Sequence, residues 1–363
     1  MKLQLNKNET LVNFGNSILK YYECHNFNNS FTKLDEILNK HQNKKVCLIL
    51  LDGFGKNIIE KYKEECPFLY SHSTLTFESV FPPTTVAATN ALLLAKYPCE
   101  TNYLGWTQYF KDLDMLIDIF PSINTLTSEK INPPITSSVL ANKNIIDLIN
   151  ENKKYKASQF MGFNFKNGDE YNLEALFEVA SSHLKENDFV YIYSSEPDHT
   201  MHDFGINHEN VKTKIKIIDN LLNKIILEHP EYLFLVIADH GMVNTSPINI
   251  NDYPEFKESI VHEIPIIEPR FAGFFVKNEE KFNQAYEKYF KDKFIKLSKN
   301  EVLKNNIFGH SKNYKKEFLE NLCDYYLVSK KEYAFTKFNF YLLGNHAGGT
   351  KEELEINLSV FNN

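Results

Sequence analysis

The sequence predicts an α/β fold built on a mostly parallel central sheet that is flanked by helices. Three short apolar runs predict strands that are buried on both faces: VCLILL (46–51), FVYIYSS (189–195) and YLFLVIA (232–238). Helical patterns lie between these runs, and strands that alternate with helices are typical of parallel sheets. With 363 residues and 43% hydrophobic content the chain can bury a large core, and its length suggests about two domains.

The predicted helices occupy the segments before and between these strands. They cover residues 30–40, 57–65, 144–154, 172–186 and 211–229. Another segment, FPPTTVAATNALLLAKYP (81–98), reads as a loop that runs into a buried helix, because its prolines stop a strand and suit the first turn of a helix. The last apolar run, LEINLSVF (354–361), predicts a closing strand.

The stretch from 246 to 335 differs in character from the rest of the chain. It is rich in Lys, Phe and Tyr, and it contains one strand-like run, FAGFFV (271–276). We therefore expect a smaller inserted α+β subdomain over 246–335, and a catalytic core formed by 1–245 together with 336–363.

The charge balance argues against two classes of partner. The formal net charge is −7, and Arg270 is the only arginine. This mixture favours neither a nucleic-acid polymer nor an anionic membrane surface. A protein that binds phosphate through arginine would need more of them. If phosphate is bound, something else must neutralise it.

The apolar runs and the cysteines bear on where the protein resides. No stretch approaches the ~18 apolar residues of a membrane span, and the first twenty residues show no apolar region of signal-peptide length. The five cysteines form no CxxC pair, which is typical of a reducing compartment. We expect a cytoplasmic protein that makes no use of a membrane; the sequence does not define its oligomeric state.

Acidic residues follow each of the three predicted strands. Asp52 follows the first, Asp198 the second, and Asp239 with His240 the third. Ligands of open α/β sheets bind beyond the carboxyl ends of the strands, so these residues converge if the strands are neighbours. Each has an ordinary explanation when taken alone. Asp52 suits a turn before Gly53, and Asp198 suits a solvated hydrogen bond to His202, four residues later. Asp239 and His240 suit a buried pair whose hydrogen bonds are satisfied.

The combination predicts a metal centre. Three carboxylates held close together cannot all stay ionised without a cation. Three carboxylates and three imidazoles are available: Asp52, Asp198, Asp239, His202, His240 and His346. Such mixed ligands suit zinc or a similar divalent transition metal. Divided three and three, they would serve two metals, which can clamp the attacking and leaving oxygens of phosphoryl transfer.

Five segments then resemble a known family in the same order along the chain. They are LLDGFG, FPPTTVAATNALLLAKYP, YSSEPDHTMHDFG, VIADHGM and GNHAGGTKEEL. Together they are similar to the alkaline phosphatase superfamily, specifically its nucleotide pyrophosphatase/phosphodiesterase type. The resemblance implies an alkaline phosphatase-like fold. It departs from the family where HAGG stands in place of the HGG that relatives often have.

The resemblance also implies the ligand sets and the nucleophile. One ion, most often Zn²⁺ and in some cases Mn²⁺, would be held by Asp198, His202 and His346. The other would be held by Asp52, Asp239 and His240 together with the nucleophile hydroxyl. The family's nucleophile is the threonine three residues after a Phe-Pro pair, which here is Thr85 rather than Thr84. Thr84 is then expected to cap the helix.

The function implied is hydrolysis of phosphodiester or phosphoanhydride bonds in small, nucleotide-type substrates, through a phosphothreonine intermediate. The alternatives are a phosphomonoesterase or phosphonate hydrolase on the same scaffold, or a metal-binding protein without catalysis in which both threonines only cap. A diester is expected to be preferred, because no arginine lies near Thr85 in sequence to bind a second charge. Arg270 either reaches the substrate from the insert or is an ordinary surface residue.

Overall fold

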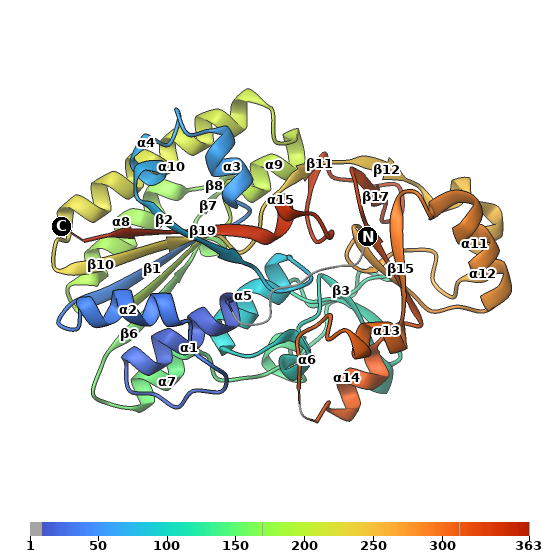
Figure 1. Ribbon diagram of the computed structural model, residues 1–363, viewed down its shortest axis with the longest axis horizontal. Coiled ribbons are helices and arrows are strands. Elements are labelled where there is room, and N and C mark those ends of the chain that lie inside the picture. The colour runs from blue at the N-terminus through green and yellow to red at the C-terminus, as the bar shows by residue number, and fades with distance from the viewer. Residues whose placement is uncertain (1–8, 169, 312, 363) are drawn as a thin grey trace.

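The computed structural model describes residues 9–168, 170–311 and 313–362, and at its centre lies a six-stranded sheet (Figure 1). The strand order is β2-β19-β10-β1-β9-β6. The strands are β1 (Lys45–Leu51), β2 (Ser73–Glu78), β6 (Ala157–Met161), β9 (Phe189–Ser194), β10 (Tyr232–Ile237) and β19 (Glu355–Phe361). β10, β1, β9 and β6 run parallel, and β19 runs antiparallel to both of its neighbours. The predicted α/β fold with a mostly parallel sheet is confirmed.

The three predicted strands are β1, β9 and β10, and they are direct neighbours. Every residue of β9 and β10, and every residue of β1 after Lys45, is buried, as continuous apolar runs predict. The register pairs Leu50 of β1 with Ile237 on one side and with Tyr193 on the other. The carboxyl ends of these strands therefore meet at one edge of the sheet.

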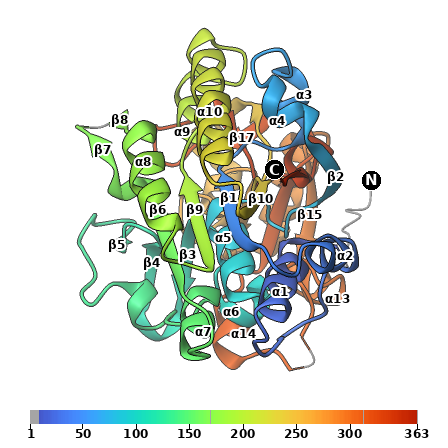
Figure 2. The ribbon, with the colours of Figure 1, turned by 90° about the vertical axis from the view of Figure 1, so that its left-hand side faces the viewer.

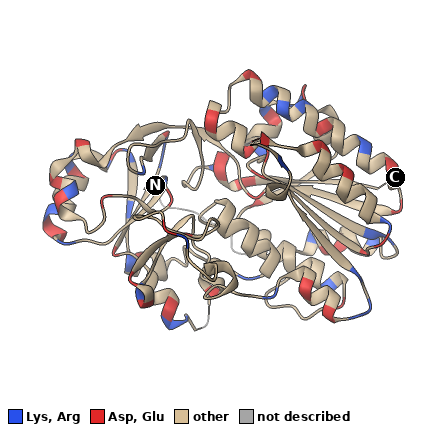
Figure 3. Cartoon of the chain, turned by 180° about the vertical axis from the view of Figure 1, so that it is seen from behind, with Lys and Arg blue, Asp and Glu red and all other residues tan. Residues whose placement is uncertain are grey.

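Helices cover both faces of this sheet (Figure 2). One face carries α1 (Leu11–Tyr21), α2 (Thr32–Lys40), α5 (Thr85–Leu94) and α7 (Ile145–Glu151). The other carries α3 (Lys56–Lys61), α4 (Pro67–Ser71), α8 (Leu173–Leu184), α9 (Asp198–Phe204) and α10 (Glu209–Glu228). The predicted helices are present with shorter or shifted ends. Acidic and basic residues are mixed over the outer helices (Figure 3), so neither sign dominates one face.

A second sheet of seven antiparallel strands lies beside the first, in the order β15-β16-β14-β13-β3-β4-β5 (Figure 1). Its strands are β3 (Thr107–Phe110), β4 (Met115–Asp118), β5 (Ile123–Asn124), β13 (Ile266–Ile267), β14 (Phe271–Phe274), β15 (Phe294–Ser298) and β16 (Tyr325–Ser329). Its helices are α11 (Pro254–Ser259), α12 (Glu279–Ala285), α13 (Lys299–Lys304) and α14 (Lys316–Asn321). Three of the strands come from the predicted core and four from the predicted insert, so the subdomain boundaries at 246 and 335 stay a prediction.

Short elements complete the fold around the edge of the first sheet. β11 (Val243–Asn244) pairs with β18 (Gly344–Asn345), and β12 (Ser246–Ile248) pairs with β17 (Tyr333–Phe335). The remaining elements are α6 (Pro98–Thr101), α15 (Lys351–Leu354), β7 (Lys166–Asn167) and β8 (Glu170–Tyr171), with short η turns between them. Within the described residues, no helix combines the length and the apolar character needed to cross a bilayer.

Candidate metal centre and active site

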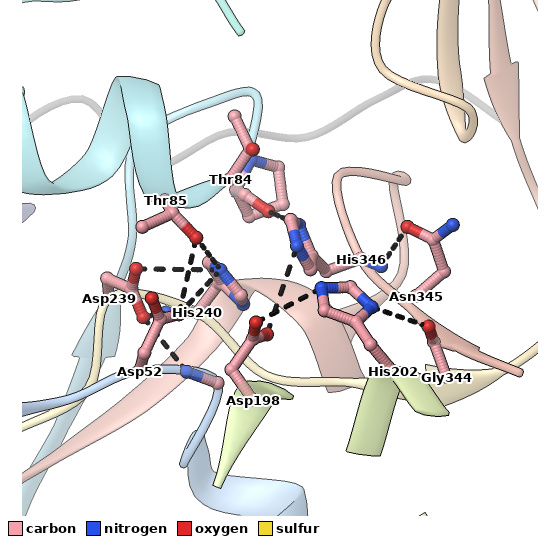
Figure 4. A network of polar contacts seen from close by, with 12 residues as sticks. Asp52, Thr84, Thr85, Asp198, His202, Asp239, His240, Gly344, Asn345 and His346 are labelled. Atoms are coloured by element: carbon pink, nitrogen blue, oxygen red, sulfur yellow. Dashed lines mark hydrogen bonds and ion pairs between the residues drawn. The ribbon is translucent and has the colours of Figure 1, made fainter. Parts of the chain in front are cut away.

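Three buried aspartates meet at the carboxyl edge of the first sheet (Figure 4). Asp52 follows β1, Asp198 opens α9 after β9, and Asp239 follows β10. The backbone N–H of Asp198 donates to the carbonyl of Asp52 (3.1 Å), and the N–H of Gly53 donates to Oδ1 of Asp239 (3.1 Å). Gly53 has φ +68°, and a Cβ there would come within 2.9 Å of Asp198. The predicted convergence of the three strand ends is therefore observed.

The histidines complete two groups of possible ligands. Nε2 of His202 lies 3.1 Å from Oδ2 of Asp198, and Nε2 of His346 lies 3.9 Å from Oδ1 of the same aspartate. Ligand atoms of Asp198, His202 and His346 all lie within 4.8 Å of one another. So do those of Asp52, Asp198 and His240. Asp198 therefore stands between the two groups.

Two contacts of His240 place Asp239 beside the second group, because its Nε2 lies 3.3 Å from Oδ1 of Asp52 and also close to Asp239. Oδ2 of Asp239 lies 3.5 Å from Nε2 of His240, and its Oδ1 accepts the N–H groups of Gly53 and His240. Asp239 thus lies with Asp52 and His240, while Asp198 lies within ligand distance of both groups. The division of the six residues between two ions stays a prediction.

Each of the three imidazoles is oriented by a backbone carbonyl. Nδ1–H of His202 donates to Gly344 (2.8 Å), that of His240 to Gly241 (3.0 Å), and that of His346 to Pro83 (3.1 Å). A hydrogen bond of this kind fixes the tautomer and leaves the Nε2 lone pair free for a metal. The rings of His240 and His346 stack with centroids 3.8 Å apart. All three Nε2 atoms therefore face the carboxylates.

The buried acids raise one another's pKa values. Burial, followed by the charges of Asp239 and Asp198, raises the pKa of Asp52 well above its usual range. Burial and the charge of Asp198 raise the pKa of Asp239 to about 7. Burial would also raise the pKa of Asp198, but the neighbouring His202 and the other two histidines outweigh it and bring that pKa below its usual range. Two of the three carboxyl groups therefore resist ionisation unless further positive charge lies beside them.

Within the described part of the chain, two carboxylate oxygens of the cluster have no hydrogen-bond partner, which bears on whether a cation fits there. Among the described residues, Oδ1 of Asp198 and Oδ2 of Asp239 are buried and accept no hydrogen bond. A buried polar oxygen without a hydrogen-bond partner costs roughly 2–7 kcal/mol even when it is neutral, and an ionised carboxylate oxygen costs more. Oxygen and imidazole donors around these two atoms are the ligands that zinc takes in proteins. The residues present therefore fit metal ions.

Thr85 lies against the second group (Figure 4). It is the first residue of α5, and its Oγ1 donates to Oδ1 of Asp52 (3.3 Å) and lies 3.3 Å from Nε2 of His240. The first backbone N–H groups of a helix have no partner within the helix, and its dipole is positive at that end. The Thr85 hydroxyl therefore lies beside two possible metal ligands and at a helix end that favours anions.

The neighbouring Thr84 has a different partner. It occupies the N-cap position of α5, but its side chain accepts no hydrogen bond from the helix. Its Oγ1 instead donates to Oε1 of Glu268 at 2.5 Å. Thr84 is therefore the N-cap residue by position, but the expectation that its side chain caps the helix is wrong, because the hydroxyl is turned to a buried carboxylate in the connection between β13 and β14 and accepts no helix N–H.

Three further residues, which the sequence did not indicate, form hydrogen bonds to residues of the site or beside it. The hydroxyl of Tyr193 donates to Oδ2 of Asp52, and Oδ1 of Asn345 accepts the N–H of His346 (2.8 Å). Oε1 of Glu268 also accepts the N–H of Trp106 (2.8 Å). Tyr193 stands near the end of a predicted buried strand, and a hydroxyl in such an apolar run indicates that it has a polar partner. The sequence around Glu268 gives no comparable indication, because its contacts depend on how the second sheet packs against the first.

Arg270 lies neither at the substrate nor on the surface. It is fully buried, and its guanidinium forms a two-bond ion pair with Glu353. Both expectations for Arg270 are therefore wrong. Among the aromatic residues between 99 and 125 and in the insert, Tyr103, Phe110 and Phe271 pack in the core, while Trp106 is 40% exposed.

Comparisons with known proteins agree with this architecture. The family model of type I phosphodiesterase / nucleotide pyrophosphatase matches residues 124–339, which is more than half of the chain and includes Asp198, His202, Asp239 and His240. A search of curated proteins found no match.

Solved structures of one protein from two organisms share the fold. Murine ectonucleotide pyrophosphatase / phosphodiesterase 5, as an inactive variant in complex with AMP, is 16% identical with a TM-score of 0.64, and the match covers 87% of each chain. The human protein is 15% identical with a TM-score of 0.65, again over 87% of each chain. The family match and the shared fold together show that this chain belongs to the type I phosphodiesterase / nucleotide pyrophosphatase family, within the alkaline phosphatase superfamily, and is a hydrolase of that type.

Proposed function

We propose that this hydrolase cleaves phosphodiester or phosphoanhydride bonds with two divalent metal ions and with Thr85 as its nucleophile. The observation that carries the proposal is the position of the Thr85 hydroxyl. It lies 3.3 Å from both Asp52 and His240, at the first residue of α5. A threonine that merely capped the helix would not need two candidate metal ligands beside its oxygen.

The ligands divide between the two ions as follows. Asp198, His202 and His346 would hold one, and Asp52, Asp239 and His240 with Thr85 would hold the other. Zn²⁺ suits these donors best and Mn²⁺ is the second choice. When bound, the ions supply Lewis acidity, which lowers the pKa of a coordinated hydroxyl or water and stabilises charge on phosphoryl oxygens.

The residues of the chain then perform a double displacement. The Thr85 hydroxyl gives up its proton, for which Asp52 is the hydrogen-bond acceptor. The Thr85 oxygen attacks phosphorus, the ester or anhydride oxygen departs with a proton, and a phosphothreonine ester remains. The phosphorus keeps its other substituent throughout. Water then attacks the same phosphorus, the Thr85 oxygen leaves and takes up a proton, and a diester substrate is released as a phosphate monoester.

The backbone of α5 binds the transferred group. The helix has ten residues, and Thr85 is its first residue, so the N–H groups that lack a partner within the helix lie at the end that carries the Thr85 side chain. They offer hydrogen bonds to the non-bridging oxygens, which become more negative as the transition state forms. This supplies positive field without an arginine.

The substrate class follows from charge. Arg270, the only arginine, is committed to Glu353 and is not available to a phosphoryl group. A diester has one negative charge on the transferred group, whereas a monoester has two, so the site suits the diester better. The murine relative was captured with AMP, which supports a nucleotide-type small molecule as substrate.

A cytoplasmic location is also part of the proposal. The five cysteines Cys24, Cys47, Cys66, Cys99 and Cys323 are all free thiols, and four of them are buried. Free buried thiols are usual in reducing compartments.

The functional test combines metal analysis with activity. The metal-free protein should be inactive towards bis(p-nitrophenyl) phosphate, and activity should return in proportion to zinc up to about two ions per chain. A metal-free preparation with full activity would contradict the proposal.

A further inference from the structure

A buried ion pair connects the second sheet to the loop that carries His346. Arg270 lies just before β14, and Glu353 lies in α15, seven residues after His346. Nε of Arg270 donates to Oε1 of Glu353 (2.6 Å), Nη2 donates to Oε2 (2.9 Å), and Nη1 donates to the carbonyl of Tyr333 (3.0 Å). Both charged side chains are completely buried. The guanidinium is thus fixed by three hydrogen bonds.

Glu353 uses the same two oxygens to hold the loop after His346. Oε1 accepts the N–H of Gly348 (2.7 Å), and Oε2 accepts the hydroxyl (2.8 Å) and the N–H (3.3 Å) of Thr350. The backbone carbonyl of Glu353 accepts the N–H of Gly241, the residue after His240 (2.9 Å). The loops of two predicted ligands therefore meet at one residue, but only the His346 loop depends on its side chain.

The His346 loop passes very close to this pair. A Cβ at Gly348 would come within 2.7 Å of Oε2 of Glu353 and 2.8 Å of Nη2 of Arg270. Ala347, between His346 and Gly348, has a left-handed φ of 78°, which L side chains rarely adopt. The loop is therefore held in a conformation that it would not adopt unaided.

We propose that Arg270 and Glu353 form a positioning pair that sets the place of His346, and so the affinity of one metal site. The proposal rests on the two-metal site proposed above. The carboxylate can accept three loop donors while buried only because the guanidinium neutralises it with a planar two-bond contact. Partners that orient a metal ligand typically affect affinity by about 10–100-fold.

The pair is expected to act on one site more than on the other. The His346 loop loses its anchor when the Glu353 side chain is no longer held. The His240 loop keeps its bond to the Glu353 backbone carbonyl. A general loss of stability would instead weaken both sites together.

The experiment measures metal affinity without using activity. Metal-free full-length protein is titrated with Co²⁺, and binding is followed by visible absorption. His346→Ala identifies the binding step that belongs to Asp198, His202 and His346. Arg270→Met should weaken that step by about 10–100-fold and leave the other within about threefold. Arg270→Lys, which keeps the charge but not the fork, should fall between wild type and Arg270→Met.

The matched control is Lys56→Met. Lys56 forms a half-exposed ion pair with Glu355, two residues beyond Glu353 (2.9 Å). Its loss removes a charge pair from the same segment without touching the His346 loop. Both Co²⁺ steps should stay unchanged in this variant.

Two further variants keep the test decisive if Arg270→Met does not fold by circular dichroism. Gly348→Ala removes no charge but places a methyl group against the pair, and Arg270→Lys keeps the buried cation. Both should weaken the His346 step selectively. Folded variants with both steps unchanged, or with both steps weakened equally, would overturn the proposal. If wild-type protein binds no Co²⁺, the proposed metal site itself fails, which is a separate result.

Discussion

The two sheets contribute to the site in different ways. The predicted ligands lie at the edge of the first sheet, where Asp52, Asp198 and Asp239 follow neighbouring parallel strands and His346 lies in the segment that leads into β19. The second sheet provides none of them. It reaches the site through the short connection between β13 and β14, where Glu268 bonds to Thr84 and Arg270 bonds to Glu353. The candidate metal ligands thus lie at the edge of the first sheet, while the second sheet contacts the segments that carry two of the site residues, Thr84 and His346.

The adjacent threonines show this division over two residues. The Thr85 side chain turns to Asp52 and His240 of the first sheet, and the Thr84 side chain turns to Glu268 of the second. Two hydroxyls at the start of one helix therefore have separate partners. Variants at these positions should separate chemistry from support.

The largest expected effect is that of Thr85→Ala. Removal of the nucleophile should lower kcat by about 10⁴-fold or more while the fold persists. Thr84→Ala should lower kcat by less than about tenfold and cost about 1–2 kcal/mol of stability, because one hydrogen bond to a carboxylate is lost. Steady-state kinetics and thermal unfolding measure both effects. If Thr84→Ala lowered kcat more than Thr85→Ala does, the assignment of Thr85 as the nucleophile would be wrong.

The next effect concerns the shared aspartate. Asp198 is proposed as a ligand of one ion, but its carboxylate also lies within 4.8 Å of ligand atoms of Asp52 and His240, whereas His202 is found only in the first group. Asp198→Asn should therefore remove the ion of its own group and also weaken binding of the other, lowering bound zinc below about one ion per chain, whereas His202→Ala should leave about one. Metal analysis after dialysis decides this. Equal losses in the two variants would contradict the central position of Asp198.

The next largest expected effect is a difference in kcat/KM between a diester and a monoester. We expect kcat/KM for the p-nitrophenyl ester of thymidine 5′-monophosphate to exceed that for p-nitrophenyl phosphate by at least about tenfold, because the second charge of the monoester finds no free arginine. Both substrates release the same p-nitrophenolate, so the comparison isolates the transferred group. A monoester preference would assign the same site to a phosphatase.

Sequence patterns revealed the first sheet better than the second for a physical reason. Parallel strands buried on both faces are continuous apolar runs, and the residues after them, such as Asp52 and Asp239, share one edge whatever the loops do. The second sheet pairs β13 with β3, about 160 residues earlier in the chain, and such long-range antiparallel pairing leaves no local pattern. The partners of Glu268 and Arg270 depend on that pairing. Their roles were therefore missed or misjudged.

The remaining effect is a pH dependence of stability that arises from Glu268. Burial raises its pKa to about 7 despite the hydrogen bonds from Thr84 and Trp106. A carboxyl whose pKa is raised in the folded protein stabilises the fold fully below its unfolded value of about 4.5, and this contribution is lost as pH rises through about 7. Wild type should thus lose up to about 3 kcal/mol between these pH values relative to Glu268→Gln. Parallel denaturant titrations measure the difference, and identical pH profiles would refute this view of Glu268.

The most direct measurement is the identity of the modified residue during turnover. Zinc-loaded enzyme is mixed with excess diester and quenched in acid, and the peptide containing FPPTTVAATN is analysed by mass spectrometry. We expect a phosphoryl ester on Thr85 in wild type and none in Thr85→Ala. An adduct on Thr84, or an adduct of the same abundance in Thr85→Ala, would contradict the assignment of Thr85 as the nucleophile.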